Sequence, residues 1–94
     1  MFGKSSRDSG RKLEDMKNLG PASARRLRAI GIETPADLRR LGAVEAYAQL
    51  RNAFPTQTTH IALYSLHGAL LNIRWRDLSN EVIAALRSAA ARRA

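Results

Sequence analysis

The fold of this chain is decided by residues 58–73, which read TTHIALYSLHGALLNI. A helix wound from this stretch is apolar around most of its circumference, so no face of it is suited to water. We therefore expect a helix that opens near Thr58 or Thr59 and lies in the middle of a small core. Gly68 lowers its helix propensity by about 1 kcal/mol relative to alanine, which close packing of a crossing helix would justify.

The composition of the whole chain also favours helices. Its 94 residues include 16 alanines and 12 leucines but only 2 valines, and no stretch shows sustained alternation of apolar and polar residues. We predict an all-α fold, a small bundle of about five to six helices. The expected helices cover residues 13–19, 21–30, 35–41 and 43–53, with a fifth opening near residue 58 and a sixth after residue 79.

Glycine and proline mark two of the expected helix boundaries. Gly20 suits the left-handed position that ends the first helix, and Pro21 suits the first position of the second. Gly31 repeats the glycine signal at the end of the second helix. Ile32 then stands where a Schellman arrangement brings it against Leu27.

Capping residues mark two further helix starts. Thr34 is the expected N-cap of the third helix, with Asp37 three residues later completing a capping box. Ser79 is the expected N-cap of the sixth helix. Leu78 and Ile83 flank it at the two positions of a hydrophobic staple.

The formal net charge is +8, from 16 Lys and Arg against 8 Asp and Glu. Residues 1–12 contribute +3, residues 13–86 contribute +2 and residues 87–94 contribute +3. We expect residues 1–12 to be a disordered basic tail, because they offer little apolar surface to bury. The helical domain is expected over residues 13–90, with fraying of the last helix beyond Arg87.

Several function classes are disfavoured by what the sequence lacks. There is no cysteine, so neither a disulfide nor a cysteine-based zinc site is expected. His60 and His67 lie about 10 Å apart along a helix, too far to share a metal ion unaided. No paired carboxylates, phosphate loop or nucleophile elbow is present. We expect no enzymatic activity, metal, cofactor or small-molecule substrate.

Location follows from the same reading. No apolar run is long enough to span a membrane, and the N-terminus lacks the apolar segment of a secretory signal. We expect a cytoplasmic protein without membrane contact.

The segment around residues 18–38 resembles a helix-hairpin-helix unit, in which backbone N–H groups at the start of the second helix hold a phosphate. Its candidate nucleic-acid-binding residues are Lys17, Asn18, Gly20, Ala22, Arg25, Arg26 and Arg28. Under the alternative interpretation, Gly20 only ends a helix and the arginines only solvate its outer face. Two details favour this alternative, because Pro21 has no N–H and Ala22 stands where DNA-binding hairpins commonly have a second glycine.

Trp75 lies between Arg74 and Arg76, where the fifth and sixth helices meet. A tryptophan between two arginines can stack on a nucleic-acid base. We favour the other interpretation, in which Trp75 closes the core at the helix corner.

These motifs together resemble the C-terminal domain of the TfoX/Sxy family. The resemblance spans roughly residues 13–86. It is carried by Leu19-Gly20-Pro21, Ser23, Leu27, Gly31-Ile32, Thr34, Asp37-Leu38, Leu41-Gly42-Ala43-Val44, Ala46-Tyr47 and Leu50, and then by residues 63–70 and Trp75-Arg76-Asp77-Leu78.

The resemblance implies a bacterial regulator tied to natural competence and DNA transformation, acting as a transcriptional co-activator. It also implies an all-helical, helix-hairpin-helix-like domain without catalytic residues. Members usually carry a separate N-terminal α/β domain, which residues 1–94 are not suited to form. The implied partners are a transcription-related protein or such a separate domain.

Two functional hypotheses follow. The first is a module that contacts a protein partner, which the near-neutral body and the co-activator role favour. The second is weak, sequence-independent DNA binding with a steep salt dependence, because phosphate contacts release counterions. We place the first slightly above the second, and the oligomeric state stays open.

Overall fold

The computed structural model describes residues 11–93, and within that range the chain is all α-helical, with no strand. It contains α1 (Pro21–Ala29), α2 (Pro35–Leu41), α3 (Ala43–Ala53), α4 (His60–Leu71) and α5 (Asn80–Arg93), with short 3-10 turns η2 (Leu13–Asp15) and η3 (Trp75–Asp77). The predicted fold class is confirmed. Of the expected basic tail, residues 1–10 lie outside the described residues.

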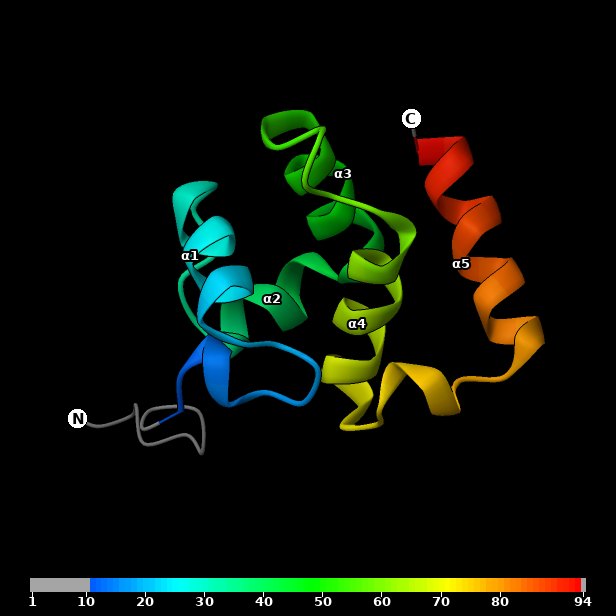
Figure 1. Ribbon diagram of the computed structural model, residues 1–94, viewed down its shortest axis with the longest axis horizontal. Coiled ribbons are helices and arrows are strands. Elements are labelled where there is room, and N and C mark those ends of the chain that lie inside the picture. The colour runs from blue at the N-terminus through cyan, green and yellow to red at the C-terminus, as the bar shows by residue number, and fades with distance from the viewer. Residues whose placement is uncertain (1–10, 94) are drawn as a thin grey trace.

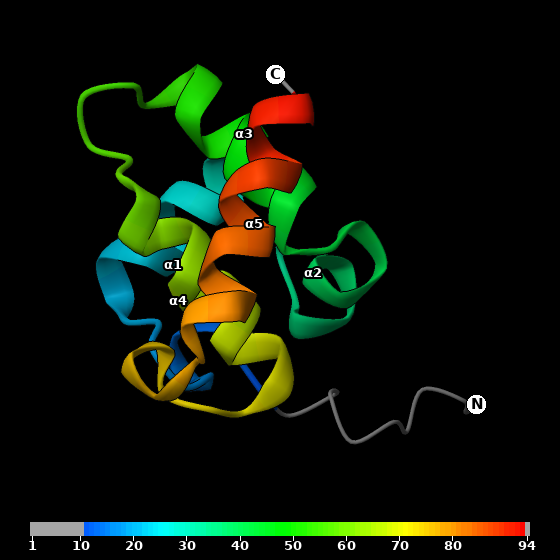
Figure 2. The ribbon, with the colours of Figure 1, turned by 90° about the vertical axis from the view of Figure 1, so that its right-hand side faces the viewer.

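The helix α4 lies in the middle of the molecule, as residues 58–73 predict (Figure 1). The helices α1 and α2 lie on one side of it and α5 lies on the other, while Figure 2 shows α5 passing in front of α4 and α3. Leu63 and Leu66 of α4 are buried in the core. Its apolar circumference is not covered throughout, because Ile61 is 49% exposed and Leu71 is 52% exposed.

The end of α1 is the Schellman arrangement that the sequence predicts. The N–H of Ile32 donates to the carbonyl of Leu27 over 2.9 Å, and the N–H of Gly31 donates to Arg28 over 3.0 Å. Gly31 has a φ of +94°, which favours glycine. Ile32 is thereby turned into the core, where it is buried.

The predicted capping residues of α2 and α5 are also confirmed. The N–H of Asp37 donates to Oγ1 of Thr34 over 3.1 Å, and the Asp37 carboxylate accepts from the N–H of Thr34 in return. The N–H of Val82 donates to Oγ of Ser79 over 3.1 Å. Each bond satisfies a donor that the helix itself leaves free.

The prediction of a helix over residues 13–19 is wrong. Only η2 is helical there, and Met16 has extended backbone angles. Gly20 is not the left-handed residue either, because it is the N-cap of α1 at a φ of −140°, whereas Asn18 has a φ of +73°. The chain leaves the helical path because Leu13 and Met16 both enter the core, while the side chain of Asn18 donates to the carbonyl of Ile73, just after α4.

The expected fraying beyond Arg87 is likewise wrong. The helix α5 continues to Arg93, whose guanidinium forms a two-bond ion pair with the carboxylate of Glu45 on α3. The second of these bonds, from Nη2 to Oε2, is 2.7 Å long. A charge counted with the basic end of the chain is therefore part of the folded domain.

Within residues 11–93, no helix combines the length and the apolar character needed to cross a membrane.

Candidate functional site

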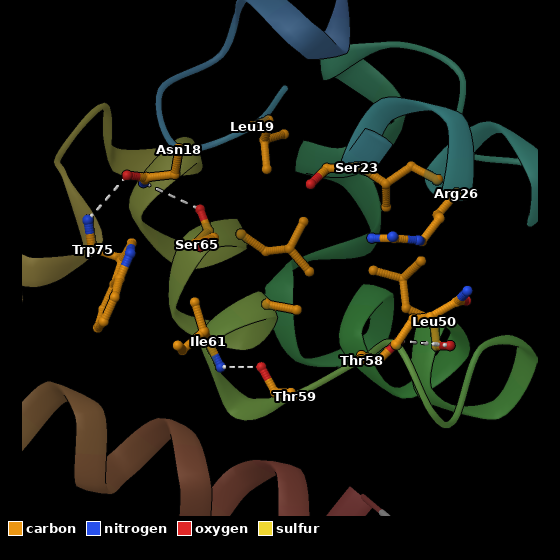
Figure 3. A pocket seen from close by; sticks show the side chains of 14 residues that line it. Asn18, Leu19, Ser23, Arg26, Leu50, Thr58, Thr59, Ile61, Ser65 and Trp75 are labelled. Atoms are coloured by element: carbon orange, nitrogen blue, oxygen red, sulfur yellow. Dashed lines mark hydrogen bonds between the residues drawn. The ribbon is translucent and has the colours of Figure 1, made fainter. Parts of the chain in front are cut away.

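A cleft of about 360 Å³ lies between α1 and α4 (Figure 3). Its inner wall is formed by leucines of three helices, Leu27 of α1, Leu50 of α3 and Leu66 of α4. Hydroxyl groups of Ser23, Thr59 and Ser65 line it as well, as do the side chains of Arg26 and Ile61. The cleft thus combines an apolar interior with polar groups.

Helical spacing explains what α1 contributes to the cleft. Ser23, Arg26 and Leu27 are three and four residues apart, so they share one face of the helix. Leu27 is fully buried and anchors α1 to the core. Arg26 beside it is half-buried, and its guanidinium points into the cleft in Figure 3.

The opposite wall is held by two threonines that precede α4. Thr58 is buried, and its hydroxyl donates to the carbonyls of Leu50 over 3.2 Å and of Phe54 over 2.8 Å, both at the end of α3. Thr59 caps α4 by accepting from the N–H of Ile61 over 3.3 Å. The loop between α3 and α4 is therefore fixed at both of its last residues, and Ile61 is held at the first turn of α4.

Asn18 closes one end of the cleft. Its Nδ2 donates to the carbonyls of Ser65, over 3.3 Å, and Ile73, over 2.9 Å, while its Oδ1 accepts from the N–H of Trp75 over 3.1 Å. A Cβ at position 68 would lie 2.5 Å from both Nδ2 of Asn18 and the carbonyl oxygen of Ile73. Gly68 is thus needed for close packing as expected, but against a side chain and a turn rather than a crossing helix.

The electrostatics of the cleft depend on Arg26, the one charged residue among the described residues that line it. Arg26 forms no ion pair with a carboxylate of residues 11–93. Arg28, two residues later, is paired with Glu14 at 2.6 Å. A backbone N–H and the Arg28 guanidinium both donate to the Glu14 carboxylate, so its pKa is lowered. Arg26 therefore offers a positive charge that this part of the chain does not neutralise.

The seven candidate nucleic-acid-binding residues do not gather into one site. Lys17, Ala22 and Arg25 are exposed, Gly20 is the N-cap of α1, Arg28 is paired with Glu14, and only Asn18 and Arg26 line the cleft. The carboxamide of Asn18 is occupied by its three hydrogen bonds within the fold. Nucleic-acid binding by this set stays a prediction.

No motif in the sequence marks the residues that face Arg26 across the cleft, namely Thr59, Ile61 and Ser65. They are more than 30 positions away from it in the sequence, so no local motif joins them to α1. One feature of the sequence does point to Ile61. It is a large apolar residue in the first turn of a helix that is apolar on all sides, and a small core cannot cover such a helix completely. The sequence alone does not say which side of the helix stays open.

Trp75 packs against the core cluster, as the favoured interpretation predicts. The centroid of its ring lies 5.9 Å from that of Tyr64, and the guanidinium carbon of Arg76 lies 5.6 Å from the Trp75 ring. Both neighbours occupy surface on which a base would have to stack.

No group of three or more potential metal-ligating side chains lies together among the described residues.

Comparison with known proteins adds to this picture. The family model described as the TfoX C-terminal domain matches residues 9–90. No curated protein matches the chain.

Two solved structures of Listeria monocytogenes proteins are similar to this fold. A triclinic crystal form of an uncharacterized protein has a TM-score of 0.76 and 29% identity, with 81% of this chain and 85% of that chain covered. A tetragonal form of a protein of unknown function has a TM-score of 0.77 and 28% identity, with coverages of 85% and 98%.

Proposed function

The chain belongs to the TfoX C-terminal domain family, and from that premise we propose that it is a non-enzymatic regulatory module of competence that contacts a protein partner through the cleft between α1 and α4. Its role is that of a transcriptional co-activator in the cytoplasm. The observation that carries the proposal is that a cationic residue, Arg26, and an exposed apolar residue, Ile61, line the same cleft.

The chemistry of the cleft defines the occupant. Ile61 is 49% exposed and offers apolar surface beside the leucine wall. Arg26 offers a positive charge, and none of the described residues that line the cleft is an Asp or Glu that would oppose an incoming carboxylate. The complementary segment carries an apolar side chain next to an Asp or Glu. We assign it to a transcription protein or to a separate N-terminal-type domain.

The two adjacent arginines of α1 allow a matched test. Arg26→Glu reverses the charge inside the cleft, whereas Arg25→Glu makes the same change on an exposed residue that does not line it. A reporter driven by a competence promoter is expected to lose at least about tenfold of its activation with Arg26→Glu, because charge reversal in a contact strongly weakens it. Arg25→Glu is expected to retain activation.

Ile61→Glu supplies a second variant on the opposite wall, with circular dichroism of each purified variant confirming that it is folded. Full activation by both Arg26→Glu and Ile61→Glu would refute the cleft as the partner site. A photo-crosslinker at Ser23, on the same cleft, would then be expected to capture no transcription protein.

A second candidate function is sequence-independent contact of α1 with DNA. It is favoured by Lys17 and Arg25, which are exposed and form no ion pair with a carboxylate of residues 11–93. This function predicts that Arg25→Glu and Arg26→Glu weaken duplex binding alike, with a salt dependence that falls in both variants. If Arg25→Glu and Arg26→Glu lower DNA binding equally but only Arg26→Glu lowers reporter activation, activation depends on the cleft and not on DNA contact by α1.

A further inference from the structure

A second concavity, of about 660 Å³, lies between α3 and α5 and reaches the first residue of α4. Its polar lining residues include Tyr47, Arg51, Asn52, His60 and Arg87, and three alanines line it as well. We propose that this groove binds the phosphate backbone of a nucleic acid, without reading its sequence. It shares no lining residue with the α1–α4 cleft, so this inference is independent of the partner proposed there.

The two walls of the groove both carry unneutralised positive charge. Arg51 comes from the last turn of α3 and Arg87 from the middle of α5, and these helices lie side by side in Figure 2. Both side chains are exposed, and neither forms an ion pair with a carboxylate of residues 11–93. Among residues 11–93, no Asp or Glu lines the groove.

Several arginines of the fold are not available to a ligand, because a carboxylate already binds them. The Arg28, Arg40, Arg74 and Arg93 guanidinium groups are each paired with a carboxylate. Arg93 also lines the groove, but its guanidinium is already bound by Glu45, which is not a lining residue. Among the described lining residues, the charge that remains for a ligand is that of Arg51 and Arg87, one on each wall.

Contacts within the groove hold two of its donors in place. Nη1 of Arg51 donates to the hydroxyl of Tyr47 over 3.3 Å, so one end of the guanidinium is fixed and other N–H groups remain for an anion. The ring of Tyr47, itself buried, stacks on that of His60 with centroids 6.2 Å apart. Guanidinium, imidazole and carboxamide groups are the donors that proteins present to phosphate oxygens.

The small side chains of the groove distinguish a phosphate backbone from a protein segment. The apolar residues that line it are Ala48, Ala90 and Ala91, which allow close approach but offer no deep apolar pocket for a large side chain. Tight protein interfaces depend on such buried aromatic or aliphatic anchors. A groove with small apolar residues and charged walls instead suits a polyanion whose contacts are to its backbone.

The test measures binding of the full chain to a fluorescently labelled duplex and to a single strand, by anisotropy at rising KCl concentrations. The double variant Arg51→Gln/Arg87→Gln removes one charge from each wall. It is expected to lower affinity at low salt on the order of tenfold or more, and to reduce the slope of log affinity against log salt by about 2 for the duplex.

The matched control is Arg40→Gln/Arg74→Gln, which removes the same net charge from two exposed residues outside the groove. It is expected to retain most of the affinity. Equal losses in the two double variants would attribute binding to overall charge, and a larger loss in the control would place binding away from the groove. Either result overturns the inference. The inference is also overturned if excess unlabelled duplex fails to displace the labelled nucleic acid from the protein.

Two further measurements keep the test decisive. An acidic peptide, polyglutamate, is expected to bind much more weakly than nucleic acid, and the opposite order would identify a protein partner instead. Chemical-shift mapping of the unaltered chain with duplex DNA needs no variant, so it tests the groove even if a double variant does not fold. Shifts are expected at the backbone amides of Asn52 and Ala90, and their absence while α1 shifts would refute the groove.

Discussion

The backbone N–H of Trp75 donates a 3.1 Å hydrogen bond to Oδ1 of Asn18, a residue 57 positions earlier in the chain. The Nδ2 of the same carboxamide donates to the carbonyls of Ser65 and Ile73. One side chain therefore joins the segment before α1 to α4 and to the turn that follows it. This connection fixes one end of the α1–α4 cleft, because Asn18, Ser65 and Trp75 all line it.

We predict that Asn18→Gly lowers the free energy of unfolding by about 2–4 kcal/mol, since three backbone groups lose their partner. Asn18→Ala is expected to lose roughly 1 kcal/mol more, because its φ of +73° disfavours a side chain that cannot bond locally. Urea denaturation measures both changes. Equal stability of Asn18→Gly and the unaltered protein would show that these hydrogen bonds contribute nothing net.

Gly68→Ala is predicted to destabilise the protein by about 1–3 kcal/mol, although alanine is the better helix former. The added Cβ would lie 2.5 Å from Asn18 Nδ2 and from the Ile73 carbonyl oxygen. Gly20→Ala is the control, because a Cβ there has no neighbour within 4 Å and its φ is not positive. Thermal unfolding of the two variants tests this, and a stabilised Gly68→Ala would contradict the close approach.

Leu66→Ala is predicted to reduce stability by about 2–5 kcal/mol, because Leu66 is 2% exposed in the centre of the core. Leu70 is only partly buried, so Leu70→Ala is expected to cause a smaller loss. Leu71→Ala, at a residue 52% exposed, is expected to change stability by no more than about 0.5 kcal/mol. Chemical denaturation should show the largest loss for Leu66→Ala, a smaller loss for Leu70→Ala and the smallest for Leu71→Ala. Any other order would show that the core does not lie where we place it.

The ion pair between Glu45 and Arg93 predicts a dependence of stability on pH. Hydrogen bonds from Arg93 and then from Gln49 lower the pKa of Glu45 to about 2, from an ordinary value of 4.5. Since the folded pKa is depressed, the pair stabilises the fold fully above pH 4.5 and loses this contribution as the pH falls toward 2. Glu45→Gln is therefore expected to unfold more easily near neutral pH and to match the unaltered protein near pH 2. A stability difference that stays constant across this range would refute the linkage.

The parts of the fold that the sequence predicts correctly are those that local contacts decide. The capping box of Thr34 and Asp37 spans three residues, and the Schellman bond from Ile32 to Leu27 spans five. Their partners are neighbours along the chain, so residue types and spacing are enough to identify them. The start of α4 follows from the same kind of signal, because Thr59 accepts from the N–H of Ile61 two residues later.

The sequence predicts the candidate site only in part, because its residues are brought together from distant parts of the chain. The hairpin reading treats Arg25, Arg26 and Arg28 as one basic group on a helix. The fold separates them, because Arg26 enters the cleft, Arg28 pairs with Glu14 and Arg25 stays exposed. The second groove was missed altogether, since Arg51 and Arg87 are 36 positions apart and belong to helices whose packing no motif reveals.

The sequence by itself determined the helical class, the helix boundaries that carry caps, and the central position of residues 58–73. These depend on propensity, periodicity and contacts within about one helical turn. Only the tertiary structure decided that Asn18 leaves the helical path to bind Ser65, Ile73 and Trp75, and that α5 continues to Arg93. Such contacts join residues about 50 positions apart, so they exist only once the core has brought the helices together.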